Sequence, residues 1–256
     1  MAGSSSLYIC IIAFAAMFGG ALIGIFAARA LPSHHLSRES ETVVKLSAGV
    51  VVSLTSLVLA LMLSAANSTF SVNAGIVKKL GSDLIYLDHT LRIYGPEAAP
   101  ARAILRAYAA GKNDELFPAS EGRPSTANRE TADLLDGLLD AILSLSPTDR
   151  RHNVLVAQAL ASTSNIYAER WLLWESPGTS VPLPFLFVLI FWLSLIFVSF
   201  GLFAPVNLTV VSSYCLSALA VAGGILMILE LSDPMHGWIH VSSEPLRRAL
   251  VEIGRP

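Results

Sequence analysis

The sequence predicts an all-α, polytopic membrane protein with four transmembrane helices in two hairpins and a helical extramembrane insert between the second and third helices. Three observations support this fold class. Only 14% of the 256 residues are charged, whereas soluble domains carry about a quarter. Charged residues are absent from three long stretches, 1–28, 46–77 and 176–229. After residue 70, apolar residues recur with the period of a helix.

Four apolar stretches have the length of a membrane span. A helix needs about 20 apolar residues to cross a hydrocarbon core of about 30 Å, and four stretches reach this length: residues 7–28, 47–66, 183–204 and 208–229. Pro205 and Asn207 lie between the last two, which predicts a tight turn. The first hairpin therefore covers residues 1–66 and the second covers 183–229. An even number of spans places both termini and the insert on the same side of the bilayer.

The predicted insert comprises residues 67–182, and residues 230–256 form a C-terminal tail. The first helix of the insert is predicted by apolar residues at spacings of three and four: Val77, Leu80, Leu84, Leu87, Leu91 and Tyr94. No proline interrupts the chain between the second span and Gly95. The span and this helix can therefore form one long helix, although Gly75 and Gly81 weaken that prediction.

Three further helices are predicted in the insert, at residues 97–110, at 129–145 and from 147 to about 174, with a loop at 111–124. The helix at 129–145 carries its apolar side chains on one face: Leu134, Leu135, Leu138, Ile142 and Leu145. Three residues predict the start of the last helix. Ser146 can cap it, Pro147 suits its first position, and Asp149 lies near the capping-box position.

Small and polar residues form a stripe on one face of the second span. They recur at spacings of three and four: Gly49, Ser53, Ser56, Ala60, Ser64 and Asn67. Two interpretations are open, a close helix–helix interface or the lining of a wet pathway. Packing is favoured, because small-residue interfaces are common in helical membrane proteins. The same packing role is predicted for two other sets of small residues: Gly20 and Gly24 in the first span, and Ser213, Ser217, Ala220 and Gly224 in the fourth.

Several function classes are disfavoured by what the sequence lacks. The net charge is −2 and no block of Lys or Arg occurs, so we predict no nucleic-acid partner. No ionisable residue lies inside a span, which argues against a proton-coupled transporter. No nucleotide-binding, hydrolase or metalloprotease motif occurs, so we predict no enzyme, no catalytic residue and no cofactor. His34 and His35, like His236 and His240, lack a complete set of ligands, so no metal site is predicted.

Five short segments together resemble the bacterial bestrophin-like family of membrane proteins. They are LPSHHLS at residues 31–37, LDHTL at 87–91, YGPE at 94–97, DPMHG at 233–237 and VSSEPL at 241–246. The resemblance extends over nearly the whole chain. The motifs are moderately specific in combination and weak individually.

The resemblance implies the bestrophin architecture. That architecture has four spans, a helical cytosolic part between the second and third spans, and a pentamer around an axial pore that passes anions. In it, the second span lines the pore with a neck of bulky apolar side chains. This sequence departs from the aromatic-rich neck and offers Val, Leu and Ser instead. The resemblance also places both termini and the insert in the cytoplasm. The distribution of Lys and Arg between the loops does not by itself decide this orientation.

Two functions from different classes follow as hypotheses. The first is an oligomeric ion channel, passing anions by analogy, in the bacterial inner membrane. In it, the second span lies nearest the axis and Ser53, Ser56, Ser64 and Asn67 face water. The second is a non-conducting membrane scaffold or sensor, in which the insert at residues 67–182 binds a protein partner. An insert of this length is sufficient for an independent helical domain.

Overall fold

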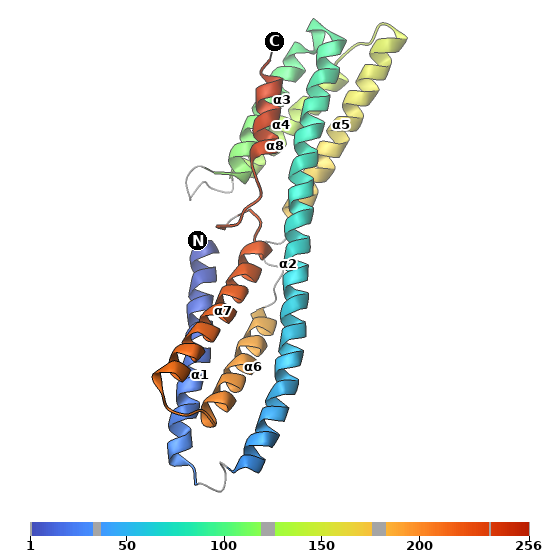
Figure 1. Cartoon of the computed structure of the whole chain (residues 1–256). Helices are drawn as coiled ribbons and strands as arrows, with labels where there is room; N and C mark the ends of the chain where they lie inside the picture. The colour runs from blue at the N-terminus through green and yellow to red at the C-terminus, as the bar shows by residue number, and fades with distance from the viewer. Residues whose placement is uncertain (1, 33–36, 119–125, 176–182, 236, 256) are drawn as a thin grey trace. The chain divides into compact units, whose positions relative to one another are not determined.

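The structure, a computed structural model, describes residues 2–32, 37–118, 126–175, 183–235 and 237–255. Across these ranges the chain is all-α, with eight α-helices and one 3-10 helix (Figure 1). It divides into two compact units. The first unit comprises Met1–Phe70 and Gly178–His240, and the second comprises Ser71–Pro177 and Val241–Pro256. The all-α class and the helical insert between the second and third spans are confirmed.

Four helices are long and apolar enough to cross a membrane. They are α1 (Ala2–Ala30), α2 (Arg38–Tyr94), α6 (Leu183–Leu202) and α7 (Leu208–Ser232). Each of these helices contains one of the predicted spans. The one difference is at the end of the third span, where Phe203 and Ala204 were expected to be helical but lie beyond the end of α6. Pro205 explains this difference, because the residue before a proline is disfavoured in helical geometry. The side chain of Asn207 then caps α7 by accepting a hydrogen bond from the backbone N–H of Val210 at 2.8 Å.

The core of the first unit forms where α1 packs against α6 and α7. Its buried side chains include Met17 from α1, Leu189 from α6 and Ile225 from α7. Glycines bring α1 and α6 into close contact. A Cβ atom on Gly24 would clash with the carbonyl oxygen of Val198, and one on Gly201 would clash with that of Ala21. The predicted packing role of the glycines in the first span is therefore confirmed.

The second span and the first insert helix are one continuous helix, α2, of 57 residues. In the second unit its predicted apolar face is buried throughout: Val77, Leu80, Leu84, Leu87, Leu91 and Tyr94. The helix ends at Gly95, which has a φ of 120°. Only glycine adopts this backbone conformation without strain, so Gly95 fixes the end of α2.

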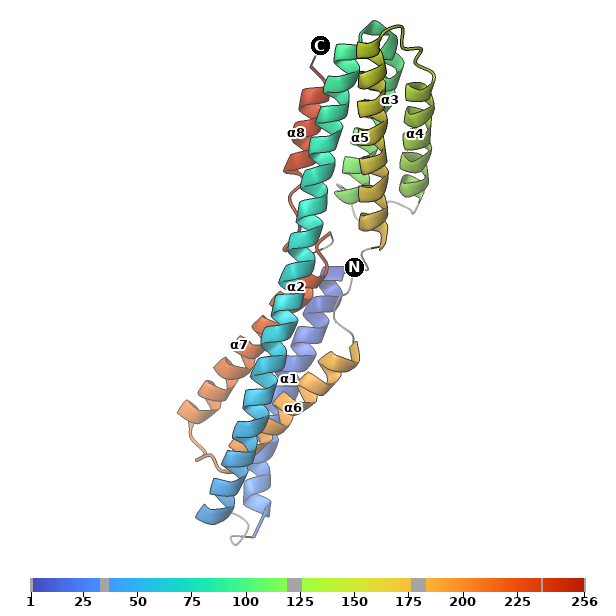
Figure 2. The same cartoon turned by 90° about the vertical axis from the view of Figure 1, so that its right-hand side faces the viewer.

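The second unit packs four shorter helices with this part of α2 (Figures 1 and 2). After the 3-10 turn η2 (Pro96–Ala98) come α3 (Ala99–Leu116), α4 (Thr126–Leu143), α5 (Arg150–Glu175) and α8 (Glu244–Ile253). The core consists of fully buried apolar side chains from each of these helices: Leu105, Leu135, Leu138, Ile142, Ile166 and Leu246. The second unit therefore has a hydrophobic core of its own.

Three predictions about these helices were wrong in detail. Helix α3 continues through Gly111 to Leu116, where a loop was predicted, and Gly111 lies so close to Thr131 that a Cβ atom there would be 3.2 Å from its methyl group. Helix α5 begins at Arg150 and not at Pro147, since the carboxylate of Asp149 accepts the backbone N–H of His152 at 2.7 Å and caps the helix there. The helix α4 ends at Leu143, two residues earlier than predicted.

Helix α8 lies in the tail, where no helix was predicted. Its buried residues are Leu246, Ala249 and Ile253, which follow helical spacing, and the helix packs against α3 in the second unit. The backbone of Pro245, in its first turn, approaches Gly81 of α2 so closely that a Cβ atom there would lie 2.8 Å from the Pro245 carbonyl oxygen. Gly81 therefore makes room for the start of α8.

Candidate functional site

The predicted stripe lies on α2 within the first unit, and every member is exposed in the single chain: Gly49, Ser53, Ser56, Ala60, Ser64 and Asn67. Another face of the same helix is covered. Thr55 and Ala66 are buried, and Leu59 and Met62 pack against the core of α1, α6 and α7. The helix therefore buries one face within the chain and leaves the stripe uncovered.

Within the described part of the chain, no helix approaches the stripe closely at Gly49. A Cβ atom on Gly49 would meet nothing within 4 Å, in contrast to the tight contacts of Gly24 and Gly201. In the most apolar 18-residue segment of each span, 11% of α2 is buried, compared with 39% of α1 and 33% of α6 and of α7. If the stripe serves packing, the packing partner is another molecule.

The hydroxyl of Ser53 is oriented by its own helix. Its Oγ donates to the carbonyl oxygen of Gly49 at 3.0 Å, as a serine four residues along a helix can do. The proton is thus used inside the helix, while the oxygen lone pairs remain available. At this position the exposed face offers a hydrogen-bond acceptor and no formal charge.

The small-residue stripe of the fourth span is also exposed in the single chain, on α7: Ser213, Ser217, Ala220 and Gly224. A Cβ atom on Gly224 would meet nothing within 4 Å. The described residues of one chain therefore do not make the packing predicted for this face.

Residues of the family-like motifs hold local structure together. In the segment at 87–91, the buried Asp88 accepts two hydrogen bonds from Arg102 of α3, from Nε at 2.8 Å and from Nη2 at 3.3 Å. In the segment at 233–237, Gly237 leaves space for the buried Glu230, whose Oε2 accepts the backbone N–H of Trp238 at 2.6 Å. These motif residues therefore have structural roles within their units.

The family assignment rests on the greater part of the sequence. Residues 15–246 match the family model described as the Bestrophin-like domain. The chain belongs to the bestrophin-like family. This match confirms the family that the five segments indicated, and with the four spans it establishes a multi-pass bestrophin-like membrane protein.

A solved structure supports the bestrophin-like fold independently. The crystal structure of a bacterial bestrophin homolog from Klebsiella pneumoniae, carrying one mutation, matches with a TM-score of 0.66. The identity is 13%, and the alignment covers 96% of this chain and 99% of that chain. At this identity the likeness concerns the fold. No curated protein matches the sequence.

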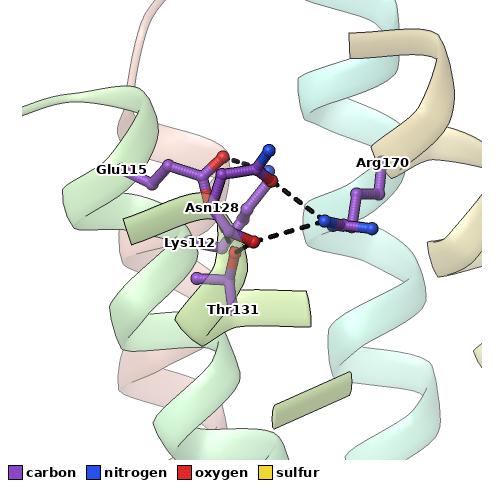
Figure 3. Close-up of polar contacts among 5 residues, drawn as sticks. All are labelled: Lys112, Glu115, Asn128, Thr131 and Arg170. Carbon is purple, nitrogen blue, oxygen red and sulfur yellow. Dashed lines mark hydrogen bonds and ion pairs between the residues drawn. The ribbon is translucent and has the colours of Figure 1, made fainter. Parts of the chain in front are cut away.

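The insert of this bestrophin-like chain contains a buried polar cluster that the sequence analysis missed (Figure 3). Lys112 of α3 is only 2% exposed, and its Nζ donates to Glu115 Oε1 at 2.7 Å. The hydroxyl of Thr131 on α4 donates to the other oxygen of Glu115 at 2.6 Å. On α5, Arg170 Nη2 donates to Asn128 Oδ1 at 3.0 Å. These contacts join α3 to α4 and α4 to α5.

Burial changes the proton affinity of groups in this cluster. It lowers the pKa of Lys112, although the hydrogen bond to Glu115 opposes the change. It raises the pKa of the Tyr108 phenol above its ordinary value. The Tyr108 hydroxyl has no hydrogen-bond partner among the residues that the structure describes. Buried polar groups without partners are uncommon and need an explanation.

No metal centre is found in the part of the chain that the structure describes, where no three His, Cys, Asp or Glu side chains are placed to hold an ion. His34, His35 and His236 lie outside the described residues, and His240 is exposed.

Proposed function

We propose that this protein is a homo-oligomeric ion channel of the bacterial inner membrane, with the stripe of α2 facing the ion pathway. The observation that supports it is the exposure of all six stripe residues in the single chain, on the least covered of the four spans. A polar face directed into hydrocarbon would leave its hydroxyl oxygens and its amide without water to bond to. Copies arranged around an axis would instead turn these faces toward water.

The subunit number follows the family, in which a pentamer surrounds an axial pore. The stripe supplies neutral polar groups of the kind that line passive pathways, and a passive pathway needs no buried charge. Apolar side chains beside the stripe, such as Val52 and Leu57, are also exposed and are suited to a hydrophobic constriction. We propose no catalytic activity, since the sequence contains no catalytic motif.

The permeant ions are proposed to be anions. In the second unit, the exposed face of α2 carries the cations Lys78 and Arg92, and none of the residues exposed between Ser71 and Tyr94 is acidic. A face with one sign of charge raises the local concentration of ions of the opposite sign. By the family analogy, this part of the chain and both termini lie in the cytoplasm.

Replacing Ser56 by tryptophan tests the pathway. Single-channel recording of the purified protein in planar bilayers is expected to show current for the wild type and to lose nearly all of it for Ser56→Trp, because an indole at each copy's stripe fills a narrow lumen. The matched control is Leu216→Trp, at an exposed position of α7, which is expected to conduct normally. Silence of the wild type over many ionic conditions, or equal currents from both variants, would contradict the proposal.

The second candidate function is a non-conducting scaffold or sensor whose insert binds a protein partner. One feature favours it, a shallow depression of about 540 Å³ on α5 lined by Arg150, Arg151, Val154, Leu155 and Gln158. Basic and apolar side chains together are suited to an acidic amphipathic segment. A monomer or dimer in lipid that carries no current would support this candidate and contradict the channel.

A further inference from the structure

Two carboxyl groups meet inside the second unit. Asp83 lies on α2 and Glu169 lies on α5, two helices that run side by side (Figures 1 and 2), and the two side chains are within hydrogen-bonding reach of each other. Glu169 is 1% exposed. Neither of its oxygens, nor Oδ2 of Asp83, has a well-aligned donor among the described residues.

One cation adjoins the pair. Lys79 Nζ lies 3.2 Å from Glu169 Oε1, while most of the lysine side chain is exposed. Two ionised carboxylates beside one ammonium leave a buried net negative charge, which is costly in the interior of a protein. Ionised carboxylates are also acceptors only, so they cannot bond to each other.

A single proton removes both problems. A protonated carboxyl group becomes a donor, so it can bond to the carboxylate that faces it. The pair then carries one negative charge, which Lys79 balances. The geometry thus supplies two acceptors, one cation and a place for one proton.

We propose that Asp83 and Glu169 form a proton-binding site that links α2 to α5 in the insert. The site is occupied on the acid side of neutrality and empties on the alkaline side. This inference stands apart from ion conduction, because it concerns a contact within the second unit alone.

The direction of titration agrees with the geometry. Burial, and then the hydrogen bond and charge of Asp83, raise the pKa of Glu169 to about 7, against the opposing effect of Lys79. A carboxyl group whose pKa is raised in the folded state binds its proton more tightly there than in the unfolded chain. Its contribution to stability is therefore complete below the ordinary glutamate pKa and is lost as the pH rises through about 7.

The other groups around the pair keep one charge state in this range. Arg170, next to Glu169 on α5, remains a cation. Tyr108 of α3 interacts with Glu169, and its raised pKa keeps the phenol neutral. On α4, the carboxylate of Asp136 accepts the hydroxyl of Tyr167. On α8, the residue that contacts α2 at Gly81 is Pro245, which is uncharged.

Infrared difference spectroscopy of the full-length purified protein tests the proposal, because protonated and ionised carboxyl groups absorb at different frequencies. Spectra taken across about pH 5 to 9, where glutamate and aspartate ordinarily stay ionised, are expected to show one carboxyl band that disappears near neutral pH. The band should be absent in Glu169→Gln, which keeps a donor at this position without titrating. A wild type without such a band, or a Glu169→Gln variant that retains it, would overturn the proposal.

Two further variants shift the titration in opposite directions, so the test survives poor folding of Glu169→Gln. Lys79→Met removes the balancing cation and should move the midpoint to higher pH. Asp83→Asn removes the facing charge and should move it to lower pH. Each shift is expected to reach about one pH unit, a tenfold change in proton affinity. Lys78→Met is the matched control, an exposed neighbour whose loss should leave the midpoint unchanged; identical midpoints in all variants would refute the site.

Discussion

Replacing Gly24 by alanine is expected to destabilise the first unit by roughly 3 kcal/mol. The added methyl group would meet the carbonyl oxygen of Val198 and the backbone at Gly201 and Leu202. These are main-chain atoms of α6, so they cannot rotate away as a flexible side chain would, and α1 must move off α6. Thermal unfolding of the purified protein in detergent, followed by circular dichroism, measures the loss.

Gly19→Ala is the matched control for this substitution. It lies on the same helix, and its Cβ atom would meet nothing within 4 Å. Since alanine favours a helix over glycine by about 1 kcal/mol, Gly19→Ala should be neutral or slightly stabilising. Equal unfolding temperatures for the two variants would show that α1 and α6 do not pack through Gly24.

Replacing Lys112 by methionine is expected to cost about 3–5 kcal/mol in the second unit. The substitution keeps most of the side-chain volume but removes the cation that Glu115 contacts at 2.7 Å. Among the residues that the structure describes, the hydroxyl of Thr131 then remains as the donor to this carboxylate. Denaturant unfolding measures the loss, and hydrogen exchange of the amides in α3 and α4 locates it.

Two variants separate this pair from an ordinary ion pair. In Lys112→Met combined with Glu115→Gln, no unpaired charge remains, so much of the stability should return. Arg248→Met removes the cation of an exposed pair with Glu244 in the same unit and should cost less than about 1 kcal/mol. If Lys112→Met is as mild as Arg248→Met, the buried cluster does not stabilise the insert.

The spans could be predicted because hydropathy is a property of each segment alone. Residues 47–66 are apolar whatever they contact, and the position of Pro205 fixes a turn by its covalent structure. The continuous helix α2 followed from the lack of proline before Gly95. The same applies to the buried face of that helix, since helical spacing alone identified Leu80, Leu84 and Leu87.

The remaining features depend on contacts between distant segments. Lys112 and Glu169 resemble ordinary surface charges in the sequence, and only the packing of α3, α4 and α5 shows that they are buried. Gly111 lies inside α3 and close to Thr131 of α4, a contact between segments that the sequence does not show. Spacing could assign the stripe to one face of α2, but it could not show that this face is exposed in the described part of the single chain.

The uncharged part of α2 is longer than a bilayer requires. It extends from Leu46 to Val77, which is about 48 Å of helix at 1.5 Å per residue, whereas a hydrocarbon core measures about 30 Å. Small changes of bilayer thickness or helix tilt beside the predicted span therefore meet only uncharged residues of α2, and the last of these residues, such as Val77, are buried in the second unit. Membranes of different thickness should accommodate this helix at little energetic cost.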